Sequence, residues 1–305
     1  MSSATPRRHR HPGPDPADSL TERVLQAMAG TADPRVRAIM AAIVRHAHAL
    51  VRELQPTPEE YEQALRFLVD LGHHTTAAKN EVVLFADVIG VSALVDQVNR
   101  TGVESETALL GPFYRGAAPW CAAGDSIARS EAPGPTLMVA GQVRNAEGGA
   151  IAGAVLDVWQ ASPVGLYENQ DQGQADMNLR GRFRADGEGR YRFRTVRPAR
   201  YPVPTDGPVG VLLSAQRRHP YRPAHLHFIV SAEGHRTLVT QVFTDAEAEL
   251  ASDVVFSATP GLMGGLHRHD RPDPAHPGAA PPFFSLEYDF VLAKGTPTFP
   301  VPPIP

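Results

Sequence analysis

The chain has 305 residues, of which 42% are hydrophobic and 20% are charged, and its formal net charge is -4. This balance argues against a dedicated nucleic-acid binder, which needs a basic surplus. No apolar run approaches the length of about 18 residues that a membrane span requires. The single cysteine, Cys121, excludes an internal disulfide and a thiolate zinc cluster, and it is typical of a cytoplasmic protein.

Prolines and glycines divide the chain into two regimes. Residues 17–110 contain 3 prolines and 4 glycines, whereas residues 111–305 contain 22 and 21. Because both residue types interrupt regular structure, the first segment is predicted to be helical and the second to consist of strands and turns. We therefore expect an α+β protein with a disordered leader over residues 1–17, a helical dimerisation or lid domain over residues 18–110, and a β-sandwich domain over residues 111–305.

The segment that follows the leader has helical periodicity. Ser19 to Glu22 and Thr57 to Glu60 both have the spacing of a capping box. Apolar residues between Val36 and Leu54 recur on one helix face, and a further, unusually apolar helix is predicted from about Lys79 to Asn99. Apolar faces this broad need a cover, so we expect a homodimer formed through the N-terminal helices.

After residue 110 the apolar residues follow a period of two, which is typical of strands. Two long stretches, residues 162–178 and 197–220, interrupt this pattern and are predicted to be functional loops without structure of their own. Many short strands at this spacing predict a β-sandwich. The expected strands are Leu137–Val143, Ile151–Trp159, Arg190–Val196, Ala224–Val230, Leu238–Phe243 and Phe283–Leu292.

Arginines alternate along two of the sheet segments. Those in residues 190–194 are interleaved with Tyr191 and Phe193, which are predicted to point inward. We interpret these arginines, and those in residues 180–184, as a solvated sheet face rather than a nucleic-acid surface.

His225 and His227 are candidate metal ligands. Positions i and i+2 of a strand face the same side about 7 Å apart, so both imidazoles can reach one ion, while Leu226, Phe228 and Val230 face the core. Two imidazoles in an apolar strand are costly unless something satisfies them. The pair alone is compatible with zinc, copper or ferrous iron, and two hydrogen-bonded structural histidines are the alternative.

Two loop tyrosines precede this pair, Tyr167 and Tyr201. Each taken singly is compatible with an ordinary packing or turn residue. Combined with the histidines they offer two phenolates and two imidazoles, a set that a small, highly charged cation such as ferric iron favours. His267 and His269 repeat the i, i+2 spacing in a segment rich in glycine and proline, and they are expected in a loop rather than in a second metal site.

These residues resemble the intradiol ring-cleaving dioxygenases, and the resemblance extends from about Ser19 to Leu292. It rests on the segments Val158 to Tyr167 and Arg222 to Phe228, and on Leu109 to Tyr114 at the junction between the helical and sandwich regions. The resemblance implies a catalytic sandwich domain with one non-haem ferric ion per subunit and a role in aromatic hydrocarbon catabolism. It implies iron ligands at Tyr167, Tyr201, His225 and His227, and catalytic roles for Arg222 and Gln241.

Within that family, residues 201–210 and 84–87 are similar to the hydroxyquinol branch. The similarity implies cleavage of hydroxyquinol (benzene-1,2,4-triol) by dioxygen to maleylacetate, with a carboxylate at Asp87 that accepts a hydrogen bond from the third hydroxyl. The alternative substrates are catechol and chlorocatechols, which would give cis,cis-muconates. The implied substrate-binding residues are Leu84, Asp87, Leu110, Gly111, Pro112, Val203, Pro204 and Val255.

Two further hypotheses accompany this interpretation. The resemblance implies a phospholipid bound in the helical domain. The rival class of function is a non-catalytic β-sandwich binding module, in which the helices serve only oligomerisation.

Overall fold

The structure is a computed structural model that describes residues 16–76, 79–100, 102, 104–244, 250–276 and 278–303. Residues 1–15 of the predicted leader lie outside the described residues. Internal contacts divide the chain into two compact units, one up to Phe67 and one from Leu68 onwards. No helix of the described ranges is long and apolar enough to cross a membrane.

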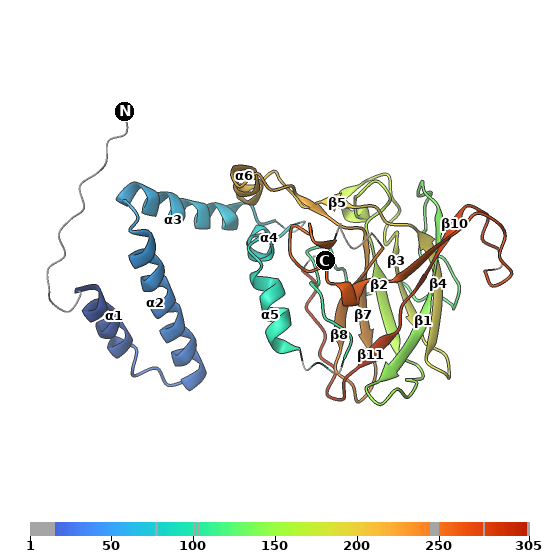
Figure 1. Ribbon diagram of the computed structural model, residues 1–305, viewed down its shortest axis with the longest axis horizontal. Helices are drawn as coiled ribbons and strands as arrows, with labels where there is room; N and C mark the ends of the chain where they lie inside the picture. The colour runs from blue at the N-terminus through green and yellow to red at the C-terminus, as the bar shows by residue number, and fades with distance from the viewer. Residues whose placement is uncertain are drawn as a thin grey trace. The chain divides into compact units, whose positions relative to one another are not determined.

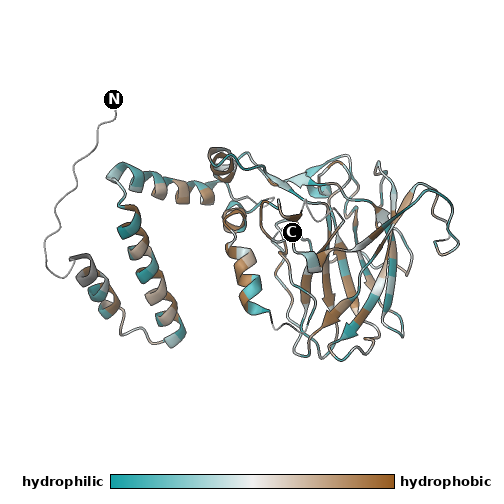
Figure 2. Cartoon of the chain, viewed as in Figure 1, coloured by the Kyte–Doolittle hydropathy of each residue, from teal (hydrophilic) through white to brown (hydrophobic). Residues whose placement is uncertain are grey.

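The first unit consists of helices. It contains α1 (Pro16–Ala27), α2 (Pro34–Leu54) and the beginning of α3 (Pro58–His73), and α1 contacts α2. The carboxylate of Asp33 caps α2 by accepting the backbone N–H of Arg35 at 2.7 Å. None of the residues of α2 is buried, and Figure 2 shows apolar residues repeated along this helix.

In the second unit, the prediction of a single helix from about Lys79 to Asn99 is wrong. The chain forms two helices there, α4 (Glu81–Val88) and α5 (Val91–Asn99). Gly90 separates them with a φ of 74°, in the left-handed region that glycine adopts without steric cost. The apolar sequence on both sides of Gly90 concealed this break.

The prediction that residues 197–220 have no structure of their own is also wrong, because α6 (Pro208–Ala215) forms inside this segment. Pro208 occupies the first turn, where its missing N–H costs nothing. The fully buried carboxylate of Glu81 accepts the backbone N–H of Val209 at 3.0 Å and so stabilises the start of α6. This contact joins α4 to α6.

The strands form two main sheets and a short ribbon (Figure 1). One sheet has the order β11-β1-β10-β9, with β4 also paired to β1, and the other has the order β3-β2-β7-β8. The ribbon pairs β5 with β6. The strands are β1 (Thr136–Asn145), β2 (Val155–Trp159), β3 (Arg180–Arg184), β4 (Arg190–Val196), β5 (Tyr201–Pro202), β6 (Tyr221–Arg222), β7 (His225–Ser231), β8 (Leu238–Phe243), β9 (Gly265–His269), β10 (Phe283–Glu287) and β11 (Phe290–Leu292).

The core lies between the two sheets. Buried side chains from both sheets form one cluster that includes Leu137 of β1, Phe193 of β4, and Leu226, Phe228 and Val230 of β7. This confirms the predicted direction of the alternate residues of β7. Helices followed by packed antiparallel and mixed sheets confirm the α+β class.

The strand predicted over Phe283–Leu292 is interrupted, because β10 and β11 are separate strands that both pair in parallel with β1. Gly141 of β1 lies opposite the interruption, and a Cβ atom there would lie 1.8 Å from the backbone oxygen of Tyr288. The missing side chain lets the backbone at Tyr288 approach β1. His267 and His269 lie on the edge strand β9, so their predicted loop conformation is wrong.

Candidate metal centre and substrate cavity

Four side chains from distant parts of the sequence converge on one face of β7. The strand places His225 and His227 on the same side, away from the inter-sheet core. Tyr201 begins β5 and pairs in register with Arg222 of β6, and Tyr167 precedes a short 3-10 turn. All four of these phenol and imidazole groups are buried.

The donor atoms of these four side chains form a closed ring. The Tyr167 Oη atom lies 2.9 Å from His227 Nε2 and 3.3 Å from Tyr201 Oη. The Tyr201 Oη atom lies 3.5 Å from His225 Nε2, and the two Nε2 atoms are 3.1 Å apart. Ligands bound about 2 Å from one small ion have separations of this size. We call this arrangement the donor ring.

Neighbouring groups fix the orientation of the donors. The Nδ1 atom of His225 lies 2.7 Å from the backbone oxygen of Pro223, to which it donates, so its Nε2 lone pair faces the donor ring. The Trp159 ring is stacked on His227 with a centroid distance of 4.7 Å and an angle of 9°. The Phe113 ring is stacked on Tyr167 at 4.6 Å. The donors are therefore preorganised.

Burial shifts the pKa values of Tyr167, His225 and His227 in the donor ring. Burial and the nearby Arg222 charge lower the pKa of His225 to about 3, and burial lowers that of His227 well below its ordinary value. Both imidazoles are thus neutral, the form that binds metals. Burial and the neighbouring Tyr201 hydroxyl raise the pKa of Tyr167 well above its ordinary value. A highly charged cation reverses that preference by stabilising the phenolate, so the donor set fits ferric iron.

A buried ion pair lies beside the donor ring. Arg222 donates from Nε to Asp253 at 3.1 Å and from Nη2 to Asp253 at 3.2 Å and to Gln241 Oε1 at 2.8 Å, while its Nη1 atom lies 3.2 Å from His225 Nε2. Burial raises the pKa of Asp253, but the charge and hydrogen bonds of Arg222 outweigh this effect and lower it overall. Gln241 Nε2 donates to the Leu109 carbonyl at 2.6 Å and lies 3.4 Å from His227 Nδ1.

The sequence did not indicate a role for Asp253, although its side chain is buried and forms an ion pair with Arg222. Its carboxylate also accepts the backbone N–H groups of Ser257 and Ala258, both at 3.1 Å. The available signal was chemical: a buried arginine requires a carboxylate partner. Sequence spacing could not say which acidic residue supplies it.

A narrow cavity of about 20 Å³ adjoins the donor ring, with room for about one water molecule. Seven of the eight residues predicted to bind substrate line it, and Leu110 does not. Leu109 lines the cavity instead, whereas Leu110 packs against the aromatic cluster around Tyr167. The full lining is Leu84, Asp87, Leu109, Gly111, Pro112, Phe113, Tyr201, Val203, Pro204, Arg222 and Val255.

Asp87 is the carboxylate in this apolar wall, and its side chain is 5% exposed. Burial raises its pKa to about 6, against the opposing effects of a hydrogen bond from Ser92 and the charge of Arg222. The raised pKa shows that ionised Asp87 lacks much of the solvation it would have in water. A hydroxyl group of a ligand in the cavity could replace part of this solvation by donating a hydrogen bond to the carboxylate.

The prediction that the arginines of residues 180–184 form a solvated face is wrong for Arg180, which is buried. Its side chain is 1% exposed and its Nε atom donates to Glu168 at 2.7 Å, while Arg115 donates to the same carboxylate oxygen at 2.8 Å. The Arg180 guanidinium lies 5.9 Å from the centre of the Tyr167 ring. Tyr191 and Phe193 point into the core as predicted. Only part of the arginine pattern therefore faces solvent.

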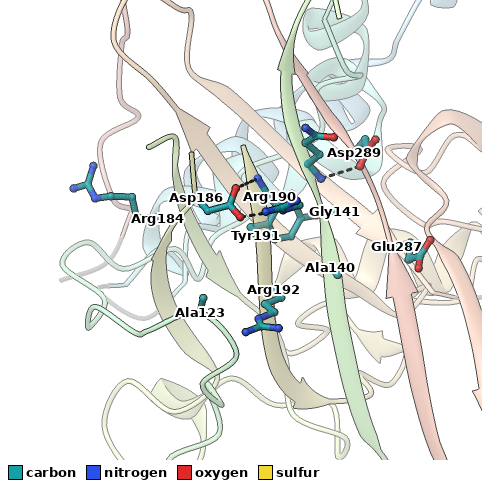
Figure 3. Close-up of a pocket in the computed structure, with 11 residues that line it drawn as sticks. Ala123, Ala140, Gly141, Arg184, Asp186, Arg190, Tyr191, Arg192, Glu287 and Asp289 are labelled. Atoms are coloured by element: carbon teal, nitrogen blue, oxygen red, sulfur yellow. Dashed lines mark hydrogen bonds and ion pairs between the residues drawn. The ribbon is translucent and has the colours of Figure 1, made fainter. Parts of the chain in front are cut away.

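A hollow of about 620 Å³ over β1 and β4 is separate from the donor ring (Figure 3). Some of its charged side chains already have partners: Arg190 donates to Asp186 at 3.0 Å, and Asp289 accepts the backbone N–H of Gln142 at 2.8 Å. None of the described residues that line it is a histidine or a cysteine. The described lining of this hollow therefore offers no imidazole donors, in contrast to the donor ring that adjoins the narrower cavity.

Comparisons with known protein families cover both parts of the chain. A sequence profile described as "Dioxygenase" matches residues 109–294, and one described as "Catechol dioxygenase N terminus" matches residues 33–107. These matches oppose the alternative of a non-catalytic binding module.

Individual relatives agree. The chain is 43% identical to hydroxyquinol 1,2-dioxygenase of Rhizobium sp. (strain MTP-10005), with 90% of this chain and 94% of the relative covered. It is 35% identical to catechol 1,2-dioxygenase of Candida albicans, with 91% and 92% covered. The crystal structure of hydroxyquinol 1,2-dioxygenase from Pseudomonas putida DLL-E4 superposes with a TM-score of 0.84 at 36% identity, covering 92% of this chain and 99% of that chain. The chain therefore belongs to the intradiol ring-cleavage dioxygenases and is an intradiol 1,2-dioxygenase enzyme.

Proposed function

We propose that this enzyme cleaves hydroxyquinol between its two adjacent hydroxylated carbons, using dioxygen and one ferric ion per subunit. The observation that carries the choice of substrate is the buried carboxylate of Asp87 in the wall of the cavity that Tyr201 and Arg222 also line. Hydroxyquinol has a third hydroxyl group that can donate to this carboxylate. Catechol, the alternative substrate, has no such group and would leave the buried charge without a new partner.

The residues of the donor ring, Tyr167, Tyr201, His225 and His227, would hold the iron. When bound, the ferric ion supplies the charge and redox capacity that activate an ortho-diol for reaction with dioxygen. Of the four donors, Tyr201 is the one that also lines the cavity. Its phenolate oxygen is therefore placed to accept a proton that the diol loses on binding.

Arg222 would stabilise the substrate electrostatically. Its guanidinium lines the cavity and keeps its proton at every working pH. The hydrogen bonds to Asp253 and Gln241 fix its position, so that the positive charge is present before negative charge develops on the ring. Gln241 would also orient His227, from which it lies 3.4 Å away.

A substrate panel tests the proposal. Oxygen uptake is measured on protein of known iron content with hydroxyquinol, catechol and a chlorocatechol, and kcat/KM is expected to be highest for hydroxyquinol. A large preference for catechol would refute the substrate and leave the reaction class intact. Concentrated protein is expected to be reddish because of phenolate-to-iron charge transfer. A preparation that stays colourless and iron-free after ferrous loading in air would refute the proposed iron site.

We also infer a homodimer in which the N-terminal helices cover each other. Ile43, Leu50 and Leu54 of α2 are 54%, 55% and 64% exposed, a large apolar area for a helix in water. Replacing Ile43 and Leu50 with glutamate is expected to convert a dimer into a monomer in light scattering, and an unchanged mass would contradict the inference. A phospholipid in this region stays a prediction.

A further inference from the structure

A second group of metal-binding side chains lies on the edge of the β11-β1-β10-β9 sheet. It comprises His269 at the end of β9 and Asp273 and His276 in the segment that follows. One potential ligand atom from each lies within 4.8 Å of the other two, and all three residues are half-buried. The two histidines of the donor ring are on β7, in the other sheet. The iron chemistry therefore does not account for this cluster.

The two imidazoles are held in place by one aromatic ring. Phe283 is fully buried and is stacked on His269 with a centroid distance of 4.4 Å and an angle of 3°. The same ring contacts His276 edge to face at 5.6 Å and 72°. The two imidazole centroids are 5.2 Å apart. Both rings are thus positioned without a hydrogen bond between them among the described contacts.

Hydrogen bonds set the direction of the remaining donor atoms. The Nε2 atom of His269 lies 2.8 Å from the Ser285 hydroxyl, and its Nδ1 atom lies 3.3 Å from Asp273 Oδ2. In the tautomer whose Nε2–H donates to Ser285, the lone pair of Nδ1 points toward the Asp273 carboxylate. A cation between these two electron-rich atoms would be attracted to both. The other Asp273 oxygen accepts the backbone N–H of Ala275 at 2.9 Å, which fixes the carboxylate. An imidazole whose second nitrogen is hydrogen-bonded is a common arrangement in metal sites.

The backbone brings the third ligand into range. The N–H of His276 donates to the backbone oxygen of Asp273 at 2.9 Å and closes a turn over residues 273–276. This turn follows β9 in the segment that connects it to β10, coloured orange-red in Figure 1. Ligands of one zinc ion are about 3.3 Å apart for bonds of about 2.0 Å, so small side-chain rotations would close the site.

We propose that His269, Asp273 and His276 bind a divalent zinc-like cation that fastens this segment to the edge strand β9. Two imidazoles and one carboxylate, with water in the fourth position, form a donor set that zinc accepts. The cation would be structural, because the site lies in a different sheet from the donor ring. It would also protect an edge strand by holding the following segment against it.

The test uses the iron-loaded enzyme and zinc as the probe. Calorimetric titration and metal analysis after dialysis are expected to give one zinc per chain in addition to iron. The variants His276→Ala and Asp273→Asn are expected to lower zinc affinity by about tenfold or more. The matched control is His267→Ala, which removes a histidine of the same strand that is not part of the cluster and is expected to bind zinc as the wild type does.

A second readout covers the case in which a variant does not fold. Cobalt added to the iron-loaded wild type is expected to give the visible absorption of a low-coordinate cobalt site, and zinc is expected to raise its Tm by a few degrees. Ring cleavage is expected to be unchanged in His276→Ala. No zinc bound beyond the iron content, or equal loss of affinity in His267→Ala and His276→Ala, would overturn the proposal.

Discussion

Replacing Asp87 with asparagine is expected to separate the two candidate substrates. The carboxylate lines the cavity and is nearly completely buried, so a hydrogen bond from the third hydroxyl of hydroxyquinol would be made to a charged acceptor. Such a bond contributes about 1.5–3 kcal/mol, whereas a bond to the neutral amide oxygen of asparagine contributes about 0.5–1.5 kcal/mol. The difference of about 1–1.5 kcal/mol lowers kcat/KM by about 5- to 12-fold. For catechol, which has no third hydroxyl, we expect a change of less than about threefold.

The same substitution is expected to stabilise the protein at alkaline pH. The pKa of Asp87 is raised from 3.8 to about 6 by burial; Arg222 opposes this shift, and the charges of Asp253 and Asp96 reinforce it. Because the folded-state pKa lies above the unfolded value, ionisation destabilises the fold as pH rises through this interval. Ionisation of Asp87 lowers the free energy of unfolding by about 3 kcal/mol above pH 6 and by about half of that near pH 5. Asparagine removes this cost.

Two assays decide the matter. Oxygen uptake gives kcat/KM for both substrates, and urea unfolding at pH 8 and pH 5 gives the stability difference. For the wild type, kcat/KM for hydroxyquinol is expected to rise as Asp87 ionises near pH 6, and this rise is expected to be absent from Asp87→Asn. Equal losses on both substrates would refute the role of Asp87, and a less stable variant at pH 8 would refute the reasoning about its burial.

Substitutions at three other positions test the supporting structure. Asp253→Asn leaves the buried charge of Arg222 unpaired and is expected to lower the free energy of unfolding by about 3–5 kcal/mol in urea. Gly111→Ala places a Cβ atom 3.2 Å from His227 Cε1 at a φ of 76°, so we expect a loss of about 1–2 kcal/mol and less bound iron by metal analysis. Glu81→Ala removes the acceptor at the start of α6 and is expected to cost about 1–3 kcal/mol, whereas Glu81→Gln retains an acceptor oxygen and is expected to cost less. Wild-type unfolding curves for Asp253→Asn or Glu81→Ala, or full iron content in Gly111→Ala, would contradict these expectations.

The sequence predicted best what depends on local periodicity. The strands β4 and β8 have the bounds expected from alternating apolar residues, and the alternate residues of β7 face the core as expected. The period of a strand fixes the direction of each side chain once one face is buried. Tyr167 and Tyr201 were different, because they lie in irregular segments, and only the family resemblance placed them with the histidines.

What the sequence did not predict depends on contacts between distant residues. The start of α6 is stabilised by Glu81, which is 128 positions away from Val209, and Arg222 is paired with Asp253 across 31 positions. Propensity within a short window carries no information on such partners. The break at Gly90 had a local signal, but the apolar residues around it outweighed that signal.

The small volume of the cavity has a consequence for the kinetics of substrate entry. A space of about 20 Å³ cannot accept an aromatic ring without movement of its wall. Binding is therefore expected to pass through an open form, and the observed association rate is expected to level off at high substrate concentration, at the rate of opening. Discrimination between ring substituents would then begin during entry, before any bond to the metal forms.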